Sequence, residues 1–138
     1  MKRVILLFAL MLASVSAFAD IREFKYFAVD IPEGWSVDEN GSVINIKADD
    51  NSGSLMIIAD SLGGESLDEL AVDFAGELGA SAVTVDSQDN YTFEFADENR
   101  QATLTGGVDE DFYMLIAGSG LEQSGDALLK ILDSLEMK

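Results

Sequence analysis

The sequence predicts an α+β protein in which a mostly antiparallel β-sheet is packed by helices on both faces. Several short segments alternate between apolar and polar residues, as half-exposed strands do. Residues 55–59 and 112–117 are apolar without alternation, which is typical of strands covered on both faces. Two further segments have helical periodicity. The order of strands, helix, strands and helix favours an antiparallel sheet with helices packed on it.

The chain begins with the features of a signal peptide. Lys2 and Arg3 precede an apolar run at residues 4–13, and residues 17–19 (AFA) form a cleavage site of the A-x-A type. The run is too short to span a membrane, which needs roughly 20 residues, so a retained anchor helix is the weaker alternative. We therefore predict a signal peptide at residues 1–19.

Cleavage would leave residues 20–138 as a single α+β domain in the periplasm or outside the cell. No later apolar stretch has spanning length, so we expect no membrane insertion after cleavage. The sequence contains no cysteine, which excludes lipoprotein-type lipid attachment and disulfide bonds. Stability must therefore come from the hydrophobic core.

The first part of the domain reads as strands and turns. Residues 24–29 alternate and lead into a turn at residues 31–35 (IPEGW). Residues 43–48 alternate again, with Lys47 on the solvent side. A turn at residues 49–53 then leads to the apolar run 55–59, and we expect the two strands to form a hairpin.

A helix follows, and both of its ends are marked in the sequence. Ser66 and Glu69 have the spacing of a capping box, in which each side chain satisfies a free amide of the first turn. Gly79 is placed to end the helix in the left-handed conformation. The predicted buried stripe is Leu67, Leu70, Ala71, Phe74 and Leu78.

The rest of the chain predicts four more strands and a final helix. Residues 82–85, 91–95 and 101–105 are β-prone, with Tyr91, Phe93 and Phe95 expected to face the core. The apolar run 112–117 reads as a central strand. The last helix should begin between Leu121 and Asp126, and its predicted buried stripe is Ala127, Leu128, Ile131, Leu132 and Leu135.

In the order of its elements the chain resembles the PsbP/Mog-like group, which includes extrinsic photosystem proteins, Ran-binding proteins and periplasmic DcrB-type bacterial proteins. The resemblance rests on residues 29–37 with the I-P-x-G-W turn, on the helix opening at residues 66–71, and on the helix end at residues 131–135. It implies an αβα sandwich and non-enzymatic roles in binding and assembling other proteins. No functional residue of the group has a match here, so the resemblance bears on architecture more than on function.

The charge balance limits the classes of partner. The chain has 8 basic and 26 acidic residues, and loss of Lys2 and Arg3 with the leader would change the formal net charge from −18 to −20. Such a charge repels phosphate backbones and anionic membrane surfaces, so nucleic acid is not an expected partner. Cationic protein surfaces and divalent cations remain. Simple solubility of an exported protein is the alternative explanation of the charge.

The residue types that most enzymes use are missing. The sequence has no histidine and no cysteine, which removes the usual zinc ligands, thiol nucleophiles and imidazole bases. Ser119 lies between two glycines but lacks the spacing of a nucleophile elbow. A pair of carboxylates is the remaining catalytic route. We predict a protein that is not an enzyme and has no cofactor.

Acidic side chains gather in the predicted turns, where clustered oxygens suit a hard cation such as calcium. No turn matches the calcium-loop pattern, and the same residue types are ordinary in hairpin turns. The candidate metal ligands are Asp49, Asp50, Asp109, Glu110 and Asp111.

Trp35 is the candidate for lining a ligand groove, beside Pro32 and Gly34. A lone tryptophan after a strand more often packs in the core or in a loop. The sequence thus favours an exported, non-catalytic binding or assembly module whose partner is another envelope or secreted protein. The alternatives are a cation-responsive or small-ligand-binding periplasmic protein and a carboxylate-based hydrolase.

Overall fold

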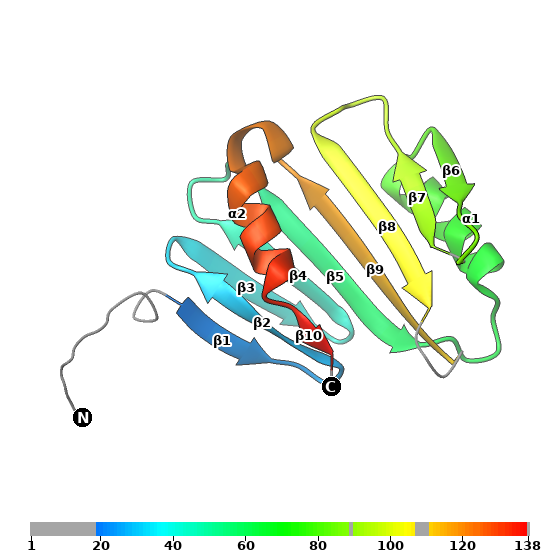
Figure 1. Ribbon diagram of the computed structural model, residues 1–138, viewed down its shortest axis with the longest axis horizontal. Coiled ribbons are helices and arrows are strands. Elements are labelled where there is room, and N and C mark those ends of the chain that lie inside the picture. The colour runs from blue at the N-terminus through cyan, green and yellow to red at the C-terminus, as the bar shows by residue number, and fades with distance from the viewer. Residues whose placement is uncertain (1–18, 89, 107–110, 138) are drawn as a thin grey trace, which may run out of the picture.

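A computed structural model describes residues 19–88, 90–106 and 111–137. The predicted signal peptide, apart from Ala19, lies outside the described residues. The elements in this part of the chain are shown in Figure 1 and are, in order, β1 (Ala19–Glu23), β2 (Phe27–Pro32), β3 (Trp35–Asn40), β4 (Val43–Ala48), β5 (Ser54–Ser61), α1 (Leu67–Leu78), β6 (Ala82–Val85), β7 (Tyr91–Glu94), β8 (Arg100–Gly106), β9 (Phe112–Ser119), α2 (Leu121–Asp133) and β10 (Glu136–Met137).

The strands form two antiparallel sheets. The large sheet has seven strands in the order β3-β4-β5-β9-β8-β7-β6, and the small sheet has the order β1-β2-β10. Every strand pair described in either sheet is antiparallel. The structure therefore confirms the α+β class with mainly antiparallel β-structure.

Two hydrophobic clusters hold the elements together, and β5 contributes to both. Leu55 and Ile57 are fully buried in the first cluster, whereas Met56 and Ile58 pack against the second. Alternate residues of a strand point to opposite faces of its sheet, so the unbroken apolar run of β5 is explained by cover on both faces. The first cluster also includes residues of β2, β4 and α2, and the second includes residues of α1, β7 and β8.

Helix α1 has the ends that the sequence predicts. The Glu69 amide donates to Ser66 Oγ at 3.2 Å, and the Ser66 amide donates to Glu69 Oε1 at 3.2 Å, which completes the capping box. Gly79 closes the helix with φ 75° and ψ 32°, in the left-handed region. The last turn has no basic residue of its own, but Arg100 of β8 donates to the Leu78 carbonyl at 2.6 Å and satisfies this end of the helix.

Helix α2 begins at Leu121, within the predicted interval, and buries Leu128 and Ile131 in the first cluster. The helix and the small sheet lie next to each other in front of the large sheet (Figure 1). Ser134, just after α2, joins the two by accepting a hydrogen bond from the Asp30 amide of β2 at 2.9 Å.

Three strands were not predicted, and the first predicted strand was misplaced. The predicted strand at residues 24–29 is interrupted because the Phe24 amide donates to the Phe27 carbonyl in a turn between β1 and β2. Strand β3 escaped prediction because four of its six residues are exposed and it pairs on one side alone, so little of it shows an apolar pattern. Strands β1 and β10 are short edge strands that depend on β2.

Candidate functional site

The turn that carries Asp49 and Asp50 has a structural role. Asp49 Oδ1 accepts a hydrogen bond from Ser36 Oγ at 3.1 Å. Asp50 Oδ1 accepts one from the Ser52 amide at 2.9 Å, and the hydroxyl and the amide of Ser52 hold the pKa of Asp50 below its ordinary value. Ser52 Oγ lies 2.8 Å from Ser124 Oγ, so the turn also packs against the first turn of α2.

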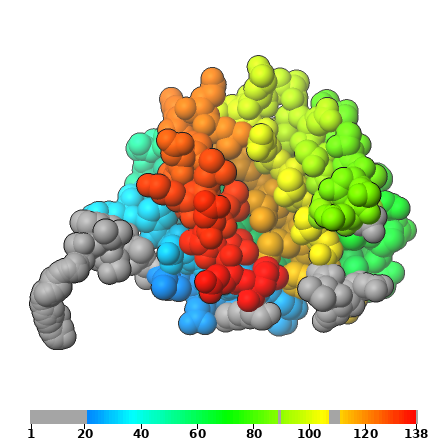
Figure 2. Space-filling model, viewed as in Figure 1, coloured from blue at the N-terminus to red at the C-terminus, as the bar shows by residue number. Residues whose placement is uncertain are grey.

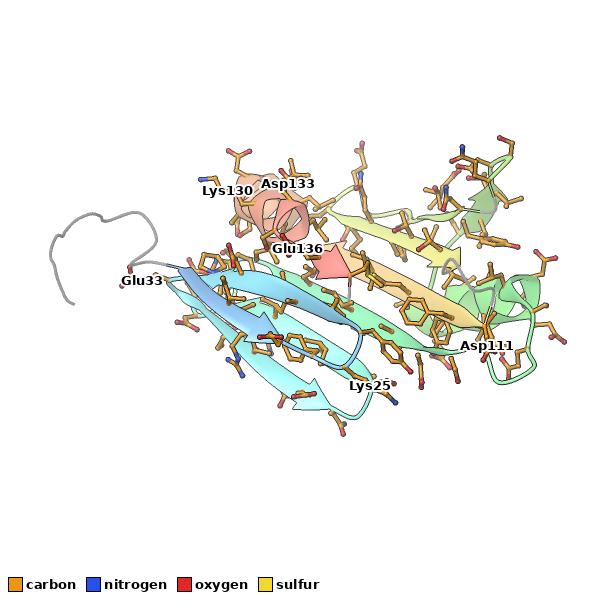
Figure 3. All side chains as sticks on the ribbon, turned by 60° about the horizontal axis from the view of Figure 1, so that its bottom comes forward. Lys25, Glu33, Asp111, Lys130, Asp133 and Glu136 are labelled. Carbon is orange, nitrogen blue, oxygen red and sulfur yellow. The ribbon has the colours of Figure 1, made fainter. Side chains whose placement is uncertain are left out.

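The other candidate metal ligands do not join this turn. Asp109 and Glu110 lie outside the described residues, and Asp111 is exposed just before β9. The Asp49 amide donates to the Gly34 carbonyl, next to Glu33, and Figure 3 shows Glu33 and Asp111 at opposite ends of the molecule. Among the described residues no group of three or more acidic side chains is placed to hold a metal ion.

The remaining acidic turns follow the same pattern as the turn at Asp50. Asp86 accepts hydrogen bonds from the amides of Gln88 and Asn90 at 2.8 and 3.0 Å. Both hydrogen bonds lower the pKa of Asp86, and the bond from the Asn90 amide has the larger effect. Asp97 likewise accepts from the Asn99 amide at 2.9 Å. These carboxylates stabilise the turns that contain them.

Trp35 lies against the first cluster and is half-buried. Trp35 does not line either of two surface hollows in the described part of the chain. One, of about 270 Å³, lies between the β1–β2 turn and the ends of β3 to β5, with Phe24, Tyr26 and Phe27 in its lining. The other is a broad polar hollow of about 700 Å³ over β3 and β4. The structure thus places Trp35 with the core.

The described carboxylates are all at least partly exposed. Ser124 is the buried polar side chain of this part of the chain, and no aspartate or glutamate whose side chain is described is buried. Asp68 of α1 accepts a hydrogen bond from the hydroxyl of the buried Tyr91. The described residues therefore offer no desolvated carboxylate of the kind that serves as a general acid.

The solvent face of α1 is acidic and carries one exposed apolar side chain. Glu69, Asp73 and Glu77 are exposed, and Val72, one turn after Glu69, is 72% exposed. The sequence has no lysine or arginine between Lys47 and Arg100, so nothing in this stretch offsets the negative charge. Arg100 itself is engaged with the Leu78 carbonyl and lies over the Phe95 ring, 4.2 Å from its centroid.

Strand β6 lies beside this helix at one edge of the large sheet. Its four residues are uncharged (AVTV), and Val85 is 54% exposed. We call the exposed residues Glu69, Val72, Asp73 and Glu77 of α1, together with β6, the α1–β6 surface. Figure 2 shows the green α1 and β6 region on the side of the molecule away from β1.

Sequence reasoning missed this surface. Two signals were visible: Val72 stands outside the apolar stripe of its helix, and residues 48–99 contain no basic residue. What the sequence did not reveal is that β6 lies at the edge of the sheet, because that position depends on the pairing order of distant strands.

Comparison with known proteins gives no identity for the chain. No protein-family model matches the sequence, and no curated protein matches it. A crystal structure from Bacteroides thetaiotaomicron VPI-5482 is similar with 14% sequence identity and a TM-score of 0.46. The similarity covers 81% of this chain and 45% of the other, so this chain spans less than half the length of that protein. At these values it carries no inference about function.

Neither helix in the described part of the chain has the length and apolar character that crossing a bilayer requires.

Proposed function

We propose that this chain is an exported, non-catalytic binding module that engages a positively charged partner protein through the α1–β6 surface. The observation that carries the proposal is the solvent face of α1, where Glu69, Asp73 and Glu77 are exposed and Val72 lies one turn from Glu69, in a stretch without basic residues. An envelope or secreted protein with a basic surface is the partner that fits.

The physical basis is electrostatic complementarity together with exposed apolar area. Like-signed charges on one surface raise the rate of encounter with an oppositely charged partner, and they disfavour wrong partners. Exposed charge pairs each contribute only about 0.2–1 kcal/mol. Val72 and Val85 supply apolar area that such charges alone lack.

The proposal includes the setting and the architecture of the protein. A signal peptide at residues 1–19 would deliver the domain to the periplasm or outside the cell. We propose a PsbP/Mog-like αβα sandwich, which is supported by the separate clusters of α1 and α2 and by the turn at Glu33 and Gly34 that follows β2. In this arrangement the small sheet would share one layer with α2.

The test is binding of a basic reagent protein, cytochrome c, to protein purified from cells expressing the full chain. The variant Asp73→Asn/Glu77→Gln removes two charges from the α1–β6 surface. The matched control, Asp38→Asn/Glu39→Gln, removes two exposed charges from β3 at the other edge of the sheet. At about 0.2–1 kcal/mol for each charge, the first variant should weaken binding about two- to thirtyfold.

The control should bind as the unmodified protein does, and both affinities should fall as salt is added. Equal weakening in the two variants would show that binding follows net charge and not this surface. No measurable binding at low salt would contradict the proposed function itself.

A further inference from the structure

We propose that β6 is a docking strand, to which an extended segment of the cationic partner adds as an eighth strand of the large sheet. The inference rests on the proposed function and deepens it, because it names the form in which the partner binds. Strand addition of this kind uses backbone hydrogen bonds for affinity and alternate side chains for specificity.

The hydrogen bonds of the β6–β7 hairpin show which backbone groups of β6 are available. The Asp86 amide donates to the Asn90 carbonyl at 3.1 Å, which sets the phase of the antiparallel ladder. Because bonded and non-bonded pairs alternate, the pair of Thr84 with Thr92 is bonded. Val83 and Val85 then direct their N–H and C=O groups away from β7, toward the free edge.

Apart from its short length of four residues, this edge lacks the features that protect edge strands from pairing. Natural edge strands carry charged residues, proline or a bulge that prevents a further strand from adding. Strand β3, at the opposite edge, contains Asp38 and Glu39. Strand β6 contains no charged residue and no proline, so its edge is open to a partner.

The side chains around the edge are suited to an apolar residue on one face. Val85 pairs with Tyr91, and paired residues lie on the same face of a sheet. The Tyr91 hydroxyl donates to Asp68, and Val72 follows Asp68 by one helical turn on the same side of α1. Val72 and Val85 therefore flank the position that an added strand would occupy.

The negative charge near β6 determines what kind of partner segment can add to this edge. Asp86 follows the last residue of β6, and Asp68, which accepts from the Tyr91 hydroxyl, lies on the side of α1 that faces this edge, with no basic residue between Lys47 and Arg100 to balance them. A segment in which apolar residues alternate with lysine or arginine offers an apolar face to Val72 and Val85 and charges to these carboxylates. The partner chemistry is thus a basic, extended peptide segment.

A second copy of this chain fits the edge less well. Antiparallel pairing of β6 with β6 would relate the copies by a twofold axis perpendicular to the sheet, which puts both α1 helices on the same face. Their acidic faces would then lie side by side, on chains whose formal net charge is −18 each. Like charges disfavour this arrangement.

The experiment uses two acetylated nine-residue peptides as probes, one with alternating lysine and valine and one with alternating glutamate and valine. Affinity is measured by calorimetry and amide hydrogen exchange by NMR, on protein purified from cells expressing the full chain. We expect the lysine–valine peptide to bind and to slow exchange of the Val83 and Val85 amides at least tenfold. The glutamate–valine peptide should not bind.

Two variants test the edge directly. Val83→Pro removes an outward N–H without breaking the ladder to β7, and Val85→Lys places a charge at the edge. Each should weaken binding at least tenfold. Gln101→Lys is the matched control for charge, because Gln101 is exposed on β8, two strands from the edge. If Val83→Pro proves unstable in urea, the comparison of Val85→Lys with Gln101→Lys decides the outcome.

Binding of the lysine–valine peptide without protection of the Val83 and Val85 amides would overturn the docking strand. Unchanged binding by both edge variants would do the same. The proposed function would survive these results if Asp73→Asn/Glu77→Gln still weakened cytochrome c binding. Absence of binding to the peptide and to cytochrome c would overturn both proposals, and stable self-association through β6 would replace the peptide partner with a second copy.

Discussion

The junction between the β4–β5 turn and α2 allows a stability prediction from a matched pair of glycines. Gly120 precedes α2 with φ 78° and ψ 30°, and Gly79 ends α1 with φ 75° and ψ 32°. The two residues thus share one left-handed conformation. They differ in surroundings: an added Cβ at Gly120 would lie 2.6 Å from Gly53 Cα and closer still to the Ser52 carbonyl oxygen, whereas nothing lies within 4 Å at Gly79.

The magnitudes follow from this difference. An L-residue in the left-handed conformation is less stable than glycine by roughly 1–2 kcal/mol, and this applies to both positions. Forcing extra volume against backbone atoms adds about 1–3 kcal/mol, and this applies to Gly120 alone. Gly79→Ala should therefore lower the free energy of unfolding by about 1–2 kcal/mol, and Gly120→Ala by about 2–5 kcal/mol.

The assay is equilibrium unfolding in urea, followed by the fluorescence of Trp35, which is the chain's one tryptophan and packs against the first cluster. The difference between the two variants isolates the contact of Gly120 with the turn. Equal destabilisation by the two substitutions would refute the close packing of Ser52 and Gly53 on α2.

Three further predictions concern caps, pH and cations. Ser66→Ala removes the capping box and should lower the free energy of unfolding by about 1 kcal/mol, whereas Ser87→Ala in an exposed turn should leave it unchanged when both are measured in urea. The hydrogen bonds to Asp86 depress its folded-state pKa, so the stabilisation that they give is present above pH 3.8 and is lost as the pH falls through the lower folded-state pKa. The difference in urea midpoint between the unmodified protein and Asp86→Asn should therefore shrink below pH 3.8. A difference that stays constant with pH would contradict this. Because Asp49 already accepts a hydrogen bond from Ser36 of β3 and Asp50 one from the Ser52 amide, calcium and magnesium at matched ionic strength should give the same melting temperature, and a shift of several degrees with calcium alone would show a specific site.

The elements best predicted from the sequence are those whose signals are local. The capping box of Ser66 and Glu69 and the left-handed Gly79 depend on residues within one helix, and the structure confirms both. The apolar runs of β5 and β9 are also local signals. A strand whose two faces both pack against hydrophobic clusters is apolar at successive positions, so the sequence itself indicates such a strand.

The elements that were missed depend on distant partners. Trp35 begins a strand because it pairs with Ala48, and nothing in the exposed residues of β3 announces that pairing. The small sheet forms because β10, at the end of the chain, pairs with β2 near its start. A local sequence pattern cannot reveal either of these two strand pairings.

The candidate site likewise has features that the sequence shows and features that only the structure shows. Asp49, Asp50 and Trp35 stand out in the sequence, yet the structure uses the first two in a turn and the third against the core. The α1–β6 surface includes Val72, which lies outside the apolar stripe of α1, and β6, whose position at the sheet edge is known only from the strand order.

The central claim is that a cationic partner binds at the α1–β6 surface, and chemical-shift mapping by NMR tests it most directly. The protein purified from cells expressing the full chain is titrated with the lysine–valine peptide while its backbone amides are followed. The account predicts that the largest shift changes fall at residues 68–77 and 82–86. Changes centred on β3 and β4, or spread evenly over the molecule, would contradict it.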